Sequence, residues 1–196
     1  MKRIAVALTN DFADWECALV SAAARSYLGC KITTASPDGT PVTSMGGLKV
    51  LPDCAYSNLK PDDFDALLIP GGLSWEKGTA PDFSEMINAF HSAGKVVGGI
   101  CAAASAVAAS GVVNTLRHTG NSLESHQKYA TYKGEALFQS QAVAVQDGGV
   151  VTAPGTAPVS FAAELMKALG LWVPEAEAVI AQFAAEHLEL VPADAM

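Results

Sequence analysis

The stretch that decides the fold is Lys95–Ser110, KVVGGICAAASAVAAS, in which a short apolar run leads directly into an alanine-rich segment. The first part, 95–100, predicts a buried strand, and the second, 102–110, predicts a helix. Cys101 then stands at the turn between them. Such a strand-to-helix turn carries the nucleophile of many hydrolases, where small neighbours prevent steric clashes. The stretch therefore predicts an α/β fold with a nucleophile-elbow cysteine.

On both sides of this stretch, apolar runs of strand length alternate with longer segments of helical period. This alternation is typical of a mostly parallel sheet covered by helices on both faces. Turn residues in 36–50 indicate a short hairpin, and Asp147-Gly148-Gly149 indicates a second one. The predicted strands are 3–9, 31–35, 65–70, 95–100, 142–146 and 150–153, and the predicted helices are 16–28, 81–93, 102–110, 160–169 and 174–190.

The first predicted helix has an apolar stripe whose position the helical period also predicts. Five apolar residues of the segment fall mostly on one side of the helix. We expect that side to face the sheet. These residues are Ala18, Leu19, Ala22, Ala23 and Leu28.

Composition limits the number of domains and the kinds of partner. The chain has 196 residues, of which 50% are hydrophobic and 16% charged, so we expect one domain over 1–196, with 171–196 as a C-terminal helical extension. The formal charge of -8 argues against nucleic acid as a partner. No apolar run has the length of a membrane span or a secretory signal, so we expect no membrane association and a cytoplasmic location.

The four cysteines are far apart in the sequence. Cys17, Cys30, Cys54 and Cys101 form no C-x-x-C pair, which argues against a metal site and a disulfide framework. A free cysteine is most often a small buried thiol. We expect that for the first three, whereas the position of Cys101 indicates a nucleophile.

Residues that directly follow the predicted strands are candidates for a site, because ligands of such sheets gather at the carboxyl ends of the strands. A position at a helix start predicts a lowered pKa for the Cys101 thiol. Glu16 could act as its proton carrier, or as a protonated carboxyl that donates a hydrogen bond to the sulfur. The expected oxyanion or substrate-binding residues are Gly71, Gly72, Ala102, Gly155 and Thr156.

Four short motifs occur at these strand ends in order: ADWE at 13–16, IPGG at 69–72, GGICAA at 98–103 and APGT at 153–156. Together they resemble the ThiJ/PfpI family of the class I glutamine amidotransferase-like folds, over about residues 2–170. The resemblance implies a flavodoxin-like three-layer sandwich. It also implies that Cys101 is the family's reactive elbow cysteine and that Glu16 is the acid beside its sulfur.

The resemblance further implies a homodimer that needs no cofactor and acts on a small molecule. The favoured reading is a glyoxalase-like or deglycase-like enzyme for 2-oxoaldehydes. Isonitrile hydratases, amidases, reported peptidases and oxidation-sensing, stress-protective proteins also belong to the family. The alternatives kept open are therefore an isonitrile hydratase or amidase, and a non-enzymatic sensor in which Cys101 is oxidised to a sulfinate.

The chain departs from the family pattern where a histidine is expected. Ala102 stands where the peptidase-like branch has a histidine after the elbow cysteine, and Ala136 stands where the deglycase-like branch has one. His118, or less readily His126, could supply an imidazole from the loop region instead. Glu186-His187 resembles an amidotransferase pair, but it lies in the terminal helix, beyond the core where that pair belongs.

Overall fold

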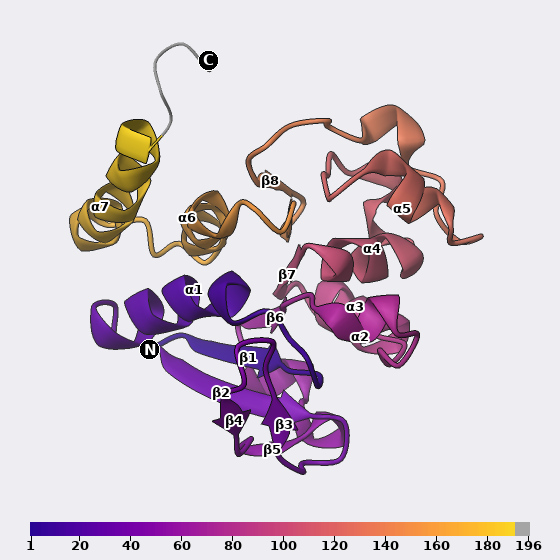
Figure 1. Ribbon diagram of the computed structural model, residues 1–196, viewed down its shortest axis with the longest axis horizontal. Coiled ribbons are helices and arrows are strands. Elements are labelled where there is room, and N and C mark those ends of the chain that lie inside the picture. The colour runs from indigo at the N-terminus through magenta and orange to yellow at the C-terminus, as the bar shows by residue number, and fades with distance from the viewer. Residues whose placement is uncertain (191–196) are drawn as a thin grey trace.

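A seven-stranded sheet in the order β5-β2-β1-β6-β7-β9-β8 forms the centre of the fold, as the computed structural model of the chain shows (Figure 1). Neighbouring strands are parallel except for the β8–β9 pair, which is antiparallel. A separate antiparallel hairpin pairs β3 with β4. The strands are β1 Arg3–Ala7, β2 Lys31–Ser36, β3 Val42–Thr43, β4 Lys49–Val50, β5 Cys54–Ala55, β6 Ala66–Ile69, β7 Val96–Ile100, β8 Val145–Asp147 and β9 Val150–Ala153.

Helices cover both faces of the sheet. α1 and α6 pack against one face, with α7 outside them, and α3 and α4 pack against the other. The flavodoxin-like three-layer sandwich predicted from the sequence is therefore confirmed, as are both hairpins. The helices are α1 Asp14–Ser26, α2 Leu73–Glu76, α3 Ser84–Ser92, α4 Ala102–Ala109, α5 Leu123–Gln127, α6 Pro158–Ala168 and α7 Pro174–Leu190.

The structure describes the backbone of residues 1–190 and the side chains of residues 1–185. Glu186 and His187 therefore lie outside the described side chains, and the last six residues of the predicted extension lie outside the described residues altogether. No helix within the described range has the length and hydropathy needed to cross a membrane. The same range contains no group of His, Cys, Asp or Glu side chains arranged to hold a metal ion.

The central strands are apolar without interruption because both of their faces are buried. In β1, Ile4 and Val6 belong to the core under α1 and α6, whereas Ala5 and Ala7 belong to the core under α3 and α4. Successive side chains of a strand point to opposite faces. A strand buried on both sides therefore shows no polar alternation, which is why these strands were predicted as continuous apolar runs.

The predicted apolar stripe of the first helix is right at Ala23, Leu19 and Leu28, which are buried or pack against the core, and wrong at two alanines. Ala18 and Ala22 are exposed, and Glu16, Cys17, Val20 and Ala24 are buried in addition to Ala23. Alanine is small, so a helix rich in it shows weak contrast between its faces. The orientation follows from the burial of Glu16, whose carboxyl group hydrogen-bonds beneath the helix.

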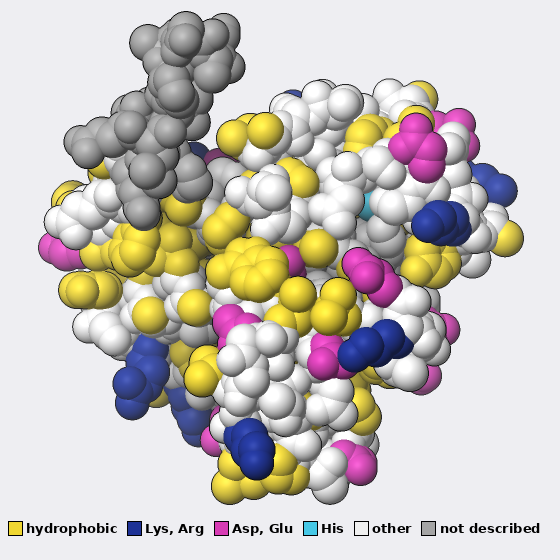
Figure 2. Space-filling view, in the orientation of Figure 1, with side chains coloured by type: hydrophobic (Ala, Val, Ile, Leu, Met, Phe, Trp, Pro, Cys, Tyr) yellow, Lys and Arg dark blue, Asp and Glu magenta, His cyan; other side chains and the backbone are white. Residues whose placement is uncertain are grey.

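The exposed side of α1 borders an apolar groove on the surface. Hydrophobic side chains gather on this face over α1, α6 and α7 (Figure 2). The groove has a volume of about 490 Å³, and Trp15, Tyr27 and Phe183 on its walls are about half exposed. Exposed aromatic side chains in one groove mark a surface suited to contact with another protein.

Candidate active site

The turn between β7 and α4 holds Cys101 in a left-handed backbone conformation, with φ 61° and ψ −126°. Such a conformation costs a non-glycine residue on the order of 1–3 kcal/mol and is concentrated at functional sites. The Cys101 amide donates to the Ala153 carbonyl oxygen of β9 at 2.9 Å. A Cβ atom on Gly99 would lie 2.6 Å from Val107 Cγ2, so the turn needs glycine there. The predicted elbow geometry is present.

Glu16 lies beside this cysteine although it comes from the first turn of α1. Its side chain is 1% exposed, and its Oε2 accepts a 2.6 Å hydrogen bond from the Gly71 amide. Its Oε1 has no conventional hydrogen-bond partner among the described residues and faces the Cys101 thiol. Burial raises the pKa of this carboxyl to about 7, so its protonated and ionised forms are both populated at neutral pH.

Gly155 separates β9 from α6 and packs directly against the pair. A Cβ atom at this position would lie 2.7 Å from Cys101 Sγ and 3.1 Å from Glu16 Oε1. Any larger residue would displace the thiol. The sulfur and the carboxyl oxygen therefore meet above a glycine Cα, which explains why the APGT motif needs glycine here.

Asn121 also contacts the sulfur, and the sequence analysis did not select it. Its Nδ2 donates to Cys101 Sγ at 3.3 Å, and its Oδ1 accepts from the Gly155 amide at 2.9 Å. On the other side of Gly155, Trp15 Nε1 donates to the Gly155 carbonyl oxygen at 3.0 Å. Asn121 and Trp15 thus hold the backbone of Gly155 through its amide and its carbonyl group. A lone asparagine in a loop belongs to no motif, so the sequence gives no signal for this contact.

The pKa of the Cys101 thiol is raised to about 11, so the predicted lowering is wrong. Burial is the largest cause, and the negative charge of ionised Glu16 adds to it. The Asn121 side chain and the Ala102 amide act in the opposite direction, because they donate to the sulfur. Desolvation outweighs the start of a helix of eight residues here.

The predicted oxyanion donors differ in their availability. Gly71 cannot offer its amide to a substrate, because that amide already donates to Glu16. Gly71 instead lets the β6 loop approach the elbow, since a Cβ there would lie 2.8 Å from the Ala102 nitrogen. Gly72 has φ 148° and pairs with Phe12 in an isolated β-bridge, so the backbone conformation at this position requires glycine. The Ala102 amide, which has no intrahelical partner, is directed at the Cys101 sulfur and stabilises negative charge there.

The histidines of the loop region do not complete the site. His118 Nε2 hydrogen-bonds Tyr132 Oη at 2.8 Å and its Nδ1 hydrogen-bonds the Leu116 carbonyl at 2.8 Å, both away from Cys101. His126 Nδ1 lies 3.1 Å from Ser105 Oγ, and its ring stacks on His118. Burial lowers the pKa of His126 to about 4. The imidazole that His118 was expected to supply is therefore not at the thiol.

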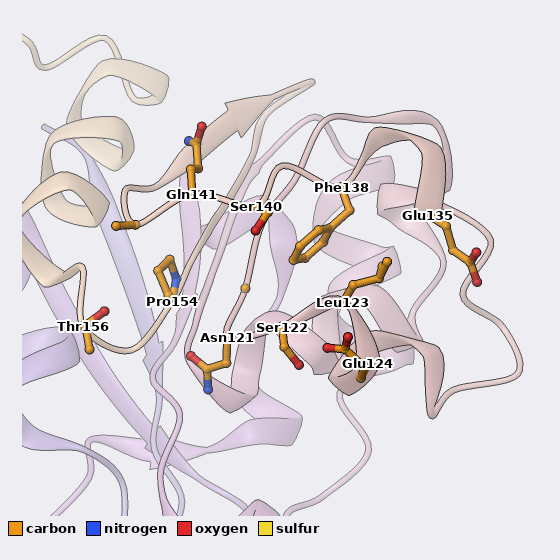
Figure 3. A pocket seen from close by; sticks show the side chains of 12 residues that line it. Asn121, Ser122, Leu123, Glu124, Glu135, Phe138, Ser140, Gln141, Pro154 and Thr156 are labelled. Atoms are coloured by element: carbon orange, nitrogen blue, oxygen red, sulfur yellow. The ribbon is translucent and has the colours of Figure 1, made fainter.

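A cavity of about 720 Å³ (Figure 3) shares the Asn121 side chain with the Cys101 sulfur, which Asn121 contacts at 3.3 Å. Asn121, Pro154 and Thr156 line the end nearest the Cys101 contacts. Glu135 lies at the other end, and Phe138 points into the space between (Figure 3). The predicted substrate-binding residue Thr156 is thus part of a cavity wall, one residue from the glycine under the sulfur.

Comparison with known proteins places this site in a family. The family model described as DJ-1/PfpI matches residues 2–168. The chain belongs to the DJ-1/PfpI family. The ThiJ/PfpI resemblance of the four motifs is thereby confirmed.

Other DJ-1/PfpI proteins show how far the similarity extends. The crystal structure of the DJ-1 superfamily protein Atu0886 from Agrobacterium tumefaciens has 62% sequence identity and a TM-score of 0.94, covering 95% of this chain and 100% of that one. A Bacillus subtilis relative named uncharacterized protease YoaZ is 30% identical over 146 residues, 74% of this chain and 69% of the relative. The glutathione-independent glyoxalase DJR-1.2 of Caenorhabditis elegans is 30% identical over 86 residues, 43% of this chain and 46% of that protein.

Proposed function

We propose that this DJ-1/PfpI protein is a cofactor-independent, cysteine-dependent enzyme that acts on small electrophilic carbonyl compounds, in the manner of a glyoxalase or deglycase. One observation carries the proposal. A buried carboxyl whose pKa is near 7 faces the thiol of Cys101 with an oxygen that has no other partner. A general acid–base group works best when its pKa lies near the working pH. Glu16 fits that requirement.

The proposed reaction of a 2-oxoaldehyde begins with addition of Cys101 to the aldehyde carbon. The C–S bond forms, the thiol proton passes to ionised Glu16, and the carbonyl oxygen becomes the hydroxyl of a hemithioacetal by taking that proton back. Glu16 then moves the C–H proton of the former aldehyde carbon to the neighbouring carbonyl carbon. The hemithioacetal hydroxyl becomes a carbonyl again, and its proton goes to the neighbouring oxygen, which ends as the only hydroxyl. The resulting thioester is hydrolysed by water to a 2-hydroxy acid and free thiol. The 2-oxoaldehyde and one water molecule together therefore contain the same atoms as the 2-hydroxy acid.

The groups that surround the sulfur suit this addition. Asn121 donates to the sulfur, and the Ala102 amide opposes the rise in the thiol pKa. Both would stabilise negative charge as the thiol loses its proton. An aldehyde is a strong electrophile, so one carboxyl group suffices as the proton carrier where an unactivated amide would need a histidine beside the nucleophile.

Amide cleavage is less well supported by the site, although a relative carries the name of a protease. Ala102 follows the nucleophile, and both loop histidines make their hydrogen bonds elsewhere. The isonitrile hydratase or amidase alternative meets the same difficulty where its chemistry needs a stronger base than Glu16.

A second candidate function is oxidation sensing, and the contacts of the sulfur favour it. A Cys101 sulfinate would find a donor in protonated Glu16 and another in Asn121 Nδ2. Two peroxide molecules would act in turn, each taking two electrons from the sulfur, transferring one oxygen to it and leaving as water. Stress protection would then not need turnover.

One preparation distinguishes the two functions. Loss of methylglyoxal and formation of lactate are measured with wild type and with Cys101→Ser, which keeps the shape of the elbow. The enzyme proposal expects turnover in wild type and none in the variant. Intact mass after mild peroxide treatment gives the other answer: addition of two oxygens at Cys101 without aldehyde turnover supports the sensor and contradicts the enzyme.

A further inference from the structure

The cavity beside Cys101 is larger than a three-carbon aldehyde requires. It has about 720 Å³ and shares Asn121 with the thiol, while Pro154 and Thr156 flank the Gly155 that contacts the sulfur. Volumes of this size are typical of sites for whole small molecules. A substrate attacked at Cys101 therefore has room to extend along this cavity.

The walls of the cavity carry charge of one sign. Glu124 and Glu135 line it, and its other described lining residues include no Lys, Arg or His. A hydrogen bond from its own backbone amide, and after it the Ser122 side chain, lower the pKa of the Glu124 carboxyl, so Glu124 is ionised at neutral pH. The remaining polar side chains, such as Asn121 and Gln141, are neutral. The formal charge of the chain, -8, adds to the negative potential.

We propose that this cavity receives the non-reacting part of the Cys101 substrate, that this part is uncharged or cationic, and that Glu124 and Glu135 exclude carboxylate and phosphate groups. The proposal rests on the proposed function for the identity of the reacting group, but not for the charge of the remainder. Neutral amides of Asn121 and Gln141 would hydrogen-bond the polar groups of such a molecule, and Phe138 would pack against its carbon atoms.

The test uses two alkylating reagents that react at the same carbon and differ in charge. Iodoacetamide is neutral and iodoacetate is an anion, and neither requires turnover. The rate ratio of the two reagents at Cys101 is measured by peptide mapping at low salt, relative to N-acetylcysteinamide in solution. We expect Cys101 to prefer the neutral reagent, and the preference to fall about threefold or more in Glu124→Gln/Glu135→Gln, because two negative charges near the path are removed.

A matched control separates the cavity from the total charge. Glu85→Gln/Glu177→Gln removes two exposed carboxylates from α3 and α7, and it should leave the preference unchanged. An unchanged preference in the cavity variant, or an equal fall in the control, would overturn the proposal. If the ratios follow the expectation but no aldehyde is turned over, the proposed function fails and the charge selection stands.

Occupancy of the cavity has its own measurement. Ser140 lines the cavity at an exposed position, so Ser140→Trp should narrow it without touching the sulfur contacts. The N-benzyl amide of iodoacetic acid should then react with Cys101 at least several-fold more slowly than in wild type, while iodoacetamide is little affected. Equal effects on both reagents would show that the larger group does not enter the cavity.

Discussion

The Gly71 amide donates a 2.6 Å hydrogen bond to Glu16 Oε2, and this contact decides which carboxyl oxygen faces Cys101. With Oε2 held by the backbone, Oε1 is left toward the thiol. The ionisation of one group affects that of the other. The pKa of the carboxyl is about 7 and that of the thiol is about 11. Below pH 7 the carboxyl is a neutral donor, and above it the carboxyl is an anion that opposes the thiolate.

The alkylation rate of Cys101 should therefore rise in two steps. The first step, near pH 7, follows ionisation of Glu16, which can then accept the thiol proton, and the second follows the thiol itself. Cys54, also partly exposed, should show only a thiol step. Mapping of iodoacetamide adducts between pH 5 and 11 checks this. Faster labelling of Cys54 than of Cys101 at pH 8 would contradict the nucleophile assignment.

Substitution of Glu16 should lower the pKa of the Cys101 thiol below about 11, because it removes the negative charge present when the thiol ionises. Glu16→Gln should lower it more than Glu16→Leu, since only the amide can donate to the thiolate. The first step near pH 7 should vanish in both variants, and turnover should fall with it. A raised pKa in Glu16→Gln would show that the carboxyl acts as a donor even at high pH.

The free energy of unfolding should fall as the pH rises from about 4.5 to about 7. The Glu16 pKa is raised from about 4.5 in the unfolded chain to about 7 in the folded one, so the unfolded state releases this proton first. At 1.4 kcal/mol per pKa unit the contribution is about 3 kcal/mol. Urea unfolding at pH 5 and pH 8 should show this difference between wild type and Glu16→Gln, and not between wild type and Glu85→Gln.

Gly155→Ala should slow alkylation of Cys101 by more than about tenfold and destabilise the fold by about 1–3 kcal/mol, because its Cβ would lie 2.7 Å from Cys101 Sγ. Gly94→Ala provides the comparison. Gly94 has φ 70° and open space around it, so alanine there brings backbone strain of about 1 kcal/mol without a clash. In Gly94→Ala the Cys101 thiol should react as in wild type. Similar thiol kinetics in both variants would mean that the sulfur moves freely around Gly155.

A second copy of the chain is the partner we expect in the groove of α1, α6 and α7. Phe183→Glu places a charge among its half-exposed aromatic side chains and should shift the molar mass in light scattering from dimer toward monomer. Leu51→Glu changes an exposed apolar residue away from that groove and should leave the mass unchanged. A monomer mass for the wild type at micromolar concentrations would contradict the expectation.

The sequence was sufficient to predict the order of the layers because each signal was local. The apolar runs, the turn residues and the two glycines of GGIC before Cys101 all act within one strand, turn or helix. The short helices α2 and α5 were not predicted, since four or five residues show no period. The predicted apolar face of α1 was wrong at Ala18 and Ala22 because alanines define a face weakly, and no local signal marked Glu16 as the buried residue that hydrogen-bonds the distant Gly71.

The site was predictable to the extent that it consists of strand ends. The contact of Asn121 with the sulfur depends on how the segment after α4 folds over the elbow, and no spacing rule encodes that path. The wrong direction of the Cys101 pKa has a related cause. A helix start is visible in the sequence, whereas desolvation depends on the residues that close over the sulfur from other segments.

The hydrogen bond from Trp15 to the Gly155 carbonyl oxygen joins two residues that are 140 positions apart in the chain. During synthesis, Cys101 leaves the ribosome before Gly155 does, so its thiol at first has the ordinary pKa of about 8.5. Completion of the fold raises this value to about 11 and lowers the thiolate fraction roughly a hundredfold or more. The nascent chain is therefore the form in which the Cys101 thiolate is most abundant at neutral pH, and completion of the fold limits its indiscriminate oxidation and adduct formation.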